Sequence, residues 1–225
     1  MPVKIAARSL NSGYHGIAAI HDIDLEVGAG EMVLLGGSNG AGKSTTLMTL
    51  AGAISPISGC VEHEGQVTTA AMHHRVRAGV GVITEQRTVF MSLTVAENLR
   101  LGRGSTETAL EYFPELEKRM KVKAGLCSGG EQQMLSVGRV LASSPSTILA
   151  DELSLGLAPI IVQRLLAALR AAADRGSAVL IVEQHVRAAM PFIDRGYFLR
   201  RGRIALTGTQ EELRKSEEQI RETYL

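Results

Sequence analysis

The stretch Gly37-Ser38-Asn39-Gly40-Ala41-Gly42-Lys43-Ser44-Thr45 decides the fold of this chain. It matches the phosphate-binding pattern G-x-x-x-x-G-K-[ST]. The apolar run at residues 32–35 before it is typical of a buried strand, and residues 44–50 after it are typical of a helix start. Glycines let backbone N–H groups point inward, and a helix N-terminus favours negative charge, so this arrangement predicts an anion site. We expect Lys43 to bind the β- and γ-phosphates of a nucleotide and the Ser44 hydroxyl to bind Mg²⁺.

Composition and charge exclude several classes of protein. The 225 residues carry 24 Lys and Arg against 23 Asp and Glu, so a net charge of +1 gives no reason to expect nucleic acid as a partner. Cys60 and Cys127 have no metal-binding spacing and suit a reducing compartment. No signal-peptide core and no bilayer-length apolar run occurs, so we expect a chain that does not cross a membrane by itself.

Apolar periodicity predicts an α/β fold around the opening stretch. Ile23, Leu25 and Val27 alternate with acidic residues, which indicates a half-buried antiparallel strand near the N-terminus. Apolar runs predict buried strands at residues 80–84, 147–152 and 178–182. A helix is expected to begin at Pro159 and to close at Gly176, followed by a hairpin at residues 195–203 and a charged helical tail at residues 210–225.

One domain over residues 1–225 accounts for these elements. Strand-like runs vanish after about residue 93, and helix formers dominate residues 95–99 and 108–121. We therefore expect a P-loop NTPase core with a mostly parallel sheet and an N-terminal antiparallel β-subdomain, made of residues 1–92 and 135–225. A small helical insert is expected at about residues 93–134.

A second potential anion site lies at Ser128-Gly129-Gly130. Glu131 and an apolar-periodic stretch follow, so these residues are typical of a helix opening that carries a hydroxyl and free N–H groups.

The strand expected at residues 147–152 ends in two carboxylates. Asp151 would belong to the Mg²⁺ shell, and Glu152 would polarise the attacking water. Because adjacent strand residues point to opposite faces, we expect the two acids not to compete for one proton. Gln184 and His185 lie just past the end of the next strand, at the sheet edge where ligand groups gather. Tyr14, judged alone, is more often a packing residue than a platform for adenine.

The order of these motifs resembles that of the ATP-binding subunits of ABC transporters, from about Tyr14 to Leu225. Residues 37–45 match the Walker A motif, residues 148–152 match Walker B, and Cys127-Ser128-Gly129-Gly130-Glu131 matches the signature motif. The signature just upstream of Walker B is highly specific to this family. The stretches at residues 131–135, 155–159 and 182–185 most resemble an ATPase of importers for branched-chain amino acids or for urea and amides.

The resemblance implies a mechanism in which two such domains close head to tail over two ATP molecules. Each γ-phosphate would lie between residues 37–45 of one chain and Ser128-Gly129-Gly130 of the other, with ATP and Mg²⁺ as cofactors and Tyr14 stacked on adenine. The implied partners are integral-membrane permease subunits, a second ATPase subunit (identical or related) and, indirectly, a solute-binding protein. The implied location is peripheral, on the cytoplasmic side of the cell membrane.

Four positions depart from the family pattern. Glu85 stands where many members of the family have Gln. The branched-chain relatives also have Glu at this position, so we expect Glu85 near the metal as the coupling residue, with Gln86 as the alternative. Leu153 replaces a common Pro, and Ala158 replaces a common acid. Gln184 aligns with the usual switch histidine, with His185 one residue late.

The choice between the last two matters chemically. An amide can hydrogen-bond a γ-phosphate, but unlike histidine it cannot carry a proton at neutral pH. We favour Gln184 in that role and keep His185 open.

Other P-loop proteins fit the sequence less well. A GTPase would need an Asn-Lys-x-Asp motif, which is absent, and a kinase has no use for the helix opening at residues 128–130. ABC ATPases of DNA repair carry long coiled-coil inserts, and those of translation carry two ATPase domains. Glu152 argues against a module that senses ATP without hydrolysis. We expect an importer ATPase, the alternatives being a soluble P-loop ATPase or an ABC ATPase of an export or non-transport system.

Overall fold

The computed structural model describes residues 1–216 and 220 of the chain. Its strands are β1 (Val3–Tyr14), β2 (Ile17–Gly28), β3 (Met32–Gly37), β4 (Ser58–His63), β5 (Gln66–Val67), β6 (Val80–Ile83), β7 (Thr147–Asp151), β8 (Ala178–Val182), β9 (Arg195–Arg200) and β10 (Arg203–Thr209). Its α-helices are α1 (Lys43–Ala51), α2 (Met72–Arg77), α3 (Val95–Arg100), α4 (Thr106–Tyr112), α5 (Gly129–Leu141), α6 (Pro159–Asp174), α7 (Val186–Ala189) and α8 (Gln210–Lys215), and the 3₁₀ helices are η1 (Pro114–Arg119) and η2 (Ala124–Leu126).

Three buried parallel strands form the centre of the molecule. Every residue of β3, β7 and β8 is buried, as expected for strands covered on both faces. They lie in a six-stranded sheet of order β10-β9-β3-β8-β7-β6, in which only β10 is antiparallel to its neighbour. Val182 pairs with both Leu35 and Asp151. The carboxyl ends of β3, β7 and β8 therefore meet at one edge of the sheet.

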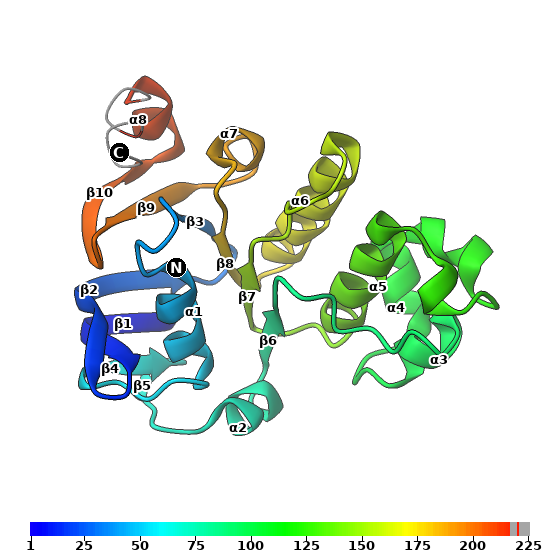
Figure 1. Cartoon of the computed structure of the whole chain (residues 1–225), viewed down its shortest axis with the longest axis horizontal. Coiled ribbons are helices and arrows are strands. Elements are labelled where there is room, and N and C mark those ends of the chain that lie inside the picture. The colour runs from blue at the N-terminus through cyan, green and yellow to red at the C-terminus, as the bar shows by residue number, and fades with distance from the viewer. Residues whose placement is uncertain (217–219, 221–225) are drawn as a thin grey trace.

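Helix α1 is packed between this sheet and a second one. The second sheet is antiparallel and has the order β2-β1-β4-β5 (Figure 1). Leu47 and Leu50 of α1 belong to one apolar cluster with Leu10 and Ile23 from the antiparallel sheet and Leu149 from the parallel sheet. This burial on both sides fixes the helix that begins at the phosphate-binding stretch.

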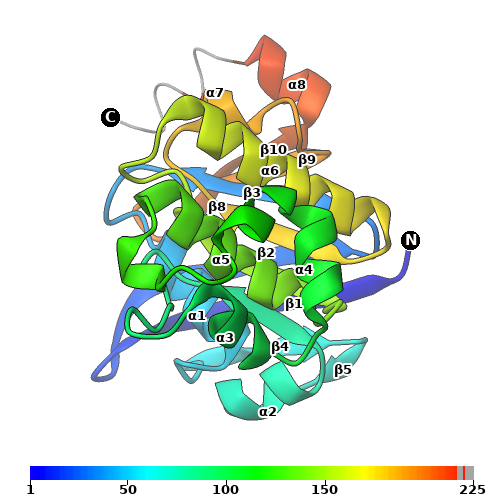
Figure 2. The ribbon, with the colours of Figure 1, turned by 90° about the vertical axis from the view of Figure 1, so that its right-hand side faces the viewer.

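The other face of the parallel sheet carries α5, α6 and the helical insert. Ile148 and Ile181 of the sheet pack in one cluster with Leu165 and Leu169 of α6 and Val137 of α5. Helices α3, α4 and α5 form a lobe that projects away from the two sheets, and Figure 2 views the molecule from that side. The expected helix over residues 108–121 is interrupted, because Pro114 restricts Phe113 to a non-helical conformation and opens η1.

The remaining elements agree closely with the sequence. Helix α6 begins at Pro159, and Gly176 follows its end with φ 103°. The hairpin expected at residues 195–203 is β9–β10, and α8 accounts for the start of the expected tail, whose residues 217–219 and 221–225 lie outside the described residues. Over the described ranges, no helix has the length and apolarity needed to cross a membrane.

Candidate functional site

The phosphate-binding stretch requires glycine at the two positions where its sequence pattern has glycine. Gly37 and Gly42 have φ angles of 139° and 105°. A Cβ at Gly37 would lie 2.4 Å from the Leu199 carbonyl oxygen, and one at Gly42 would lie 2.4 Å from Cγ2 of Ile20. Any larger residue would therefore clash as well as strain the backbone. The stretch can curve into a cradle only because these positions have no side chain.

Lys43 lies inside this cradle. Its side chain is 4% exposed, and its Nζ donates to the carbonyl oxygens of Gly37, at 2.9 Å, and Ser38, at 3.1 Å. Burial lowers the pKa of Lys43, and the charges of Glu152 and Asp151 oppose that shift. Glu152 Oε1 is 3.8 Å from the ammonium nitrogen. The cation is thus held by the loop itself, in position for the phosphates of a nucleotide.

Ser44 and Asp151 bring a hydroxyl and a carboxylate together beside the cradle. Ser44 Oγ donates to Asp151 Oδ1 at 3.2 Å, which joins the start of α1 to the end of β7. Burial raises the pKa of Asp151, the hydrogen bond from Ser44 opposes this, and the charges of Glu152 and Glu85 add to the rise. A hydroxyl and a carboxylate are the hard oxygen donors that Mg²⁺ prefers beside phosphates. No cluster of three His, Cys, Asp or Glu side chains in the described part offers a different metal site.

Glu152 leaves the extended conformation of β7. Its φ is 43°, in the left-handed region, and its Oε1 accepts a hydrogen bond from Gln184 Nε2 at 2.9 Å. The charge of Glu152 contributes to the raised pKa of Asp151. The expectation that the two acids do not compete for one proton stays a prediction. Gln184 also donates to Asn39 Oδ1 and so connects Glu152 with the phosphate-binding stretch.

An open cavity of about 680 Å³ is lined in part by Lys43, Glu152 and Gln184. Its size is in the range of small-molecule sites. The cavity is lined by Ala19, Asn39, Gly40, Gly42, Lys43, Ser44, Thr45, Glu85, Glu152, Leu155 and Gln184. The glycine cradle, the buried ammonium of Lys43 and the oxygens of Ser44 and Asp151 are compatible with a nucleoside triphosphate and its Mg²⁺.

Tyr14, Gln86 and His185 are among the predicted residues that do not line this cavity. Tyr14 is 54% exposed at the turn between β1 and β2, where it pairs with Ile17. Gln86 is exposed, and its carbonyl oxygen accepts from Thr84 Oγ1. His185 is exposed just before α7. Roles for these side chains in ATP binding or the switch stay predictions.

The Ser128-Gly129-Gly130 stretch opens α5, as predicted. The Ser128 side chain accepts from the Glu131 N–H at 3.3 Å, and Glu131 Oε2 accepts from the Ser128 N–H at 2.7 Å, which together make a capping box. None of these residues lines the cavity. Helices α1 and α5 lie in different lobes of the molecule (Figure 1). The second potential anion site is therefore separate from the first within one chain.

Sequence reasoning missed two contacts near these sites. Glu183 accepts hydrogen bonds from the Ser154 backbone N–H and hydroxyl. The acid directly after a buried strand was the only available signal for that contact. The Arg87 guanidinium lies over Gly129, where an added Cβ would be 3.0 Å from Nη1. Nothing in the sequence pattern indicates this second contact.

Comparison with known proteins gives the family. The protein-family model described as "ABC transporter" matches residues 20–154. The branched-chain amino acid transport ATP-binding protein BraG of Pseudomonas aeruginosa is 42% identical over 95% of this chain and 96% of its own. The probable branched-chain amino acid transport ATP-binding protein LivF of Archaeoglobus fulgidus is 34% identical over 92% of this chain and 93% of its own.

Two further similarities are informative. The lipopolysaccharide export ATP-binding protein LptB of Haemophilus influenzae is 31% identical over 98% of this chain and 96% of its own. A dimeric bacterial ABC transporter cassette of known structure superposes with a TM-score of 0.79 at 25% identity, over 92% of this chain and 98% of the other. The family model, the sequence relatives and the superposed cassette all indicate the same family, and the nucleotide cradle between β3 and α1 is consistent with it. The chain therefore belongs to the ABC transporter family as an ATP-hydrolysing subunit.

Proposed function

We propose that this chain powers an importer for branched-chain or other hydrophobic amino acids, or for urea-type solutes. The observation that carries the proposal is the 42% identity with BraG over nearly the whole of both chains. The 34% identity with LivF supports the same substrate class. The chain's own site supplies the ATPase, and the solute specificity belongs to the membrane subunits and to a solute-binding protein.

Each side chain at the cavity has a role in the proposed reaction. Lys43 and the backbone N–H groups of the cradle bind the phosphates. Ser44 and Asp151 would hold Mg²⁺, which would neutralise phosphate charge. Glu152 takes the proton of the attacking water. Gln184, already 2.9 Å from Glu152, hydrogen-bonds the γ-phosphate and aligns it with that base. Glu85, with Gln86 as the alternative, carries the coupling role beside the metal.

The Ser128 motif acts on the nucleotide of a second ATPase subunit. Ser128, the N-cap of α5, is exposed and can contact an anion brought by another chain. The likeness to a dimeric cassette supports this arrangement. Tyr14 then stacks on adenine from the hairpin at the edge of the cradle.

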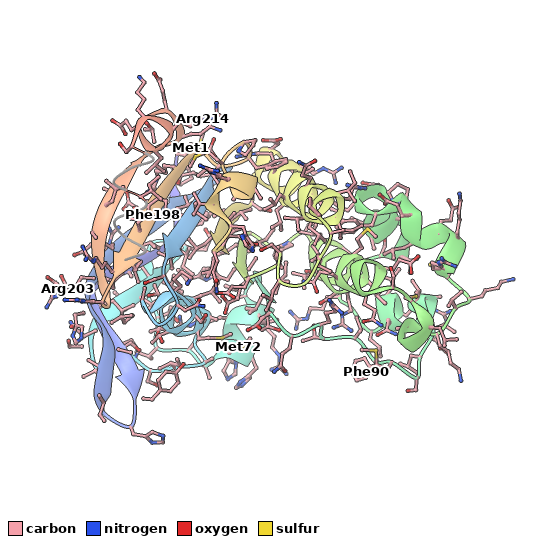
Figure 3. All side chains as sticks on the ribbon, turned by 45° about the horizontal axis from the view of Figure 1, so that its top comes forward. Met1, Met72, Phe90, Phe198, Arg203 and Arg214 are labelled. Atoms are coloured by element: carbon pink, nitrogen blue, oxygen red, sulfur yellow. The ribbon has the colours of Figure 1, made fainter. Side chains whose placement is uncertain are left out.

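An apolar surface between the core and the helical lobe is the proposed docking site for a permease subunit. Phe90, Met91 and Leu101 are 54%, 48% and 56% exposed, and Figure 3 shows Phe90 at the outer edge of the lobe. Leu101 also lines a cavity of about 420 Å³ that includes Val80 and Arg139. Clustered exposed apolar side chains mark protein interaction sites. Docking here places the chain at the cytoplasmic face of the membrane.

A second candidate function is export. The 31% identity with LptB extends over 98% of this chain, so the fold and site alone are equally compatible with an export system. The experiment that separates the two is purification of the tagged chain from membranes, with identification of its partners by mass spectrometry. Permeases and a solute-binding protein that binds leucine or urea support import.

Reconstitution extends this test. The purified complex in proteoliposomes is expected to accumulate the bound solute only with ATP, and the Glu152→Gln complex is expected to accumulate none. Copurification of lipopolysaccharide export components, with no solute-binding protein, would instead assign the chain to an export system.

A further inference from the structure

Glu183 is a buried carboxylate to which the reaction above gives no role. It follows β8, is 2% exposed, and uses both oxygens on one residue of another loop. Oε1 accepts from the Ser154 N–H at 3.2 Å, and Oε2 accepts from the Ser154 hydroxyl at 2.6 Å. Burial raises the pKa of Glu183, and the two hydrogen bonds from Ser154 oppose that shift. Because burying a carboxylate is unfavourable, we expect Glu183 to have a role other than packing.

Together with the hydrogen bond between Gln184 and Glu152, this contact forms a closed ring that joins the loops after β7 and β8. Ser154 lies two residues after Glu152, and Gln184 lies one residue after Glu183. Gln184 Nε2 donates back to Glu152 Oε1 at 2.9 Å. The loops after β7 and β8 are therefore tied together twice, once through the side chain of Glu152 and once through the carboxylate of Glu183.

The backbone of Glu152 needs such a restraint. Its φ of 43° is unfavourable for a residue with a Cβ. Conformations of this kind persist at functional sites only where the surroundings impose them. The Glu152 N–H donates to the Val182 carbonyl at 2.9 Å on one side, and Ser154 is held by Glu183 on the other.

We propose that Glu183 is a positioning residue for ATP hydrolysis. It holds residues 152–154 in the turn that directs the Glu152 carboxylate toward Lys43 and Gln184, and so toward the reacting phosphate. The inference rests on the proposed role of Glu152 as the base. Glu183 itself touches neither the nucleotide cavity nor the metal oxygens.

The test uses steady-state ATPase kinetics of four variants. Glu183→Ala removes both acceptors, Ser154→Ala removes the hydroxyl donor, and the third variant combines them. Glu183→Gln keeps the ring, because its Oε1 accepts from the Ser154 N–H and its Nε2 donates to the Ser154 hydroxyl. Thr147→Val is the matched control, since this buried hydroxyl at the other end of β7 has no hydrogen-bond partner among the described residues.

The expected result is a split between kcat and KM. Glu183→Ala lowers kcat at least about tenfold, because the Glu152 carboxylate is no longer held in position. The KM for ATP stays within about twofold. Glu183→Gln restores kcat to within about threefold of the parent, since its hydrogen bonds are retained. The double variant is no slower than Glu183→Ala, because both substitutions break one contact. Thr147→Val matches the parent.

Several results would overturn the inference. These are a parent-like kcat in Glu183→Ala, an equal loss in Glu183→Gln, or losses in the double variant that multiply. If Glu183→Ala does not fold, parent-like kcat in Ser154→Ala overturns it. Failure of the base assignment is seen separately, as a Glu152→Gln variant that hydrolyses ATP like the parent.

Discussion

Lys43 brings a positive charge to the lining of the cavity. It is buried against the carbonyl oxygens of its own loop, 3.8 Å from Glu152. We expect Lys43→Ala to weaken ATP binding at least about tenfold, since one charge-assisted hydrogen bond contributes about 1.5–3 kcal/mol. Fluorescent-nucleotide titration measures this, with the exposed Lys118→Ala as control. Unchanged affinity in Lys43→Ala would show that the cradle does not bind phosphate.

Asp151 makes magnesium binding sensitive to acid. Burial raises the pKa of this carboxyl above its ordinary range. In the metal-free protein, Asp151 therefore takes up a proton at a pH where an exposed aspartate would still be ionised, and this proton competes with Mg²⁺ for the carboxylate. The folded state takes up this proton before the unfolded state does, so the group favours folding at low pH and the loss of Mg²⁺ is not a sign of unfolding.

The measurement is Mg²⁺-dependent nucleotide affinity between pH 7 and pH 5. We expect the parent to lose this dependence on acidification, and Asp151→Asn to show little dependence at either pH. Circular dichroism over the same range checks that the parent stays folded. An identical pH profile in parent and variant would exclude Asp151 as the group responsible.

The residues at the cavity were predictable to different degrees. Lys43, Ser44 and Asp151 follow from motif spacing, because a strand, a glycine turn and a helix leave few places for these side chains. The contact between Ser154 and Glu183 joins positions 29 residues apart. It depends on how β7 and β8 pair and on the left-handed turn at Glu152, neither of which a linear pattern specifies.

Helix α6 begins without a side-chain cap. Ala158 has the extended backbone of an N-cap, with φ −65° and ψ 143°, and it makes no capping hydrogen bond. We expect Ala158→Ser to stabilise the fold by about 1 kcal/mol, because its hydroxyl can accept from the first turn. Thermal unfolding measures this. Ala171→Ser, inside the same helix, should be neutral or destabilising, and equal shifts in both variants would contradict the capping explanation.

Element types were more predictable than element ends. The central strands β3, β7 and β8 follow from continuous apolar runs, and the start of α6 follows from Pro159. Helix α5 runs without a break from Gly129 to Leu141, across the expected boundary at residues 134 and 135. Its Met134 and Val137 pack in one cluster with both the insert and the sheet, so composition alone could not locate where one part ends.

At the scale of the whole molecule, two anion sites lie apart. The phosphate cradle is between the two sheets, whereas Ser128 opens α5 in the helical lobe. The sequence contains both motifs but does not give their distance, because that depends on how the insert packs against the parallel sheet. This separation is consistent with the proposal that each ATP site is shared between two ATPase subunits.

The most direct test is the mass of Glu152→Gln with ATP and Mg²⁺ on a sizing column. We predict that this hydrolysis-deficient chain of 24.0 kDa doubles in mass when ATP is added. Adding Gly129→Asp, which places a negative charge in the signature stretch, should return it to the monomer while fluorescent ATP still binds. A dimer that survives the second substitution, or a monomer that can no longer bind ATP, would contradict an ATP site shared between two chains.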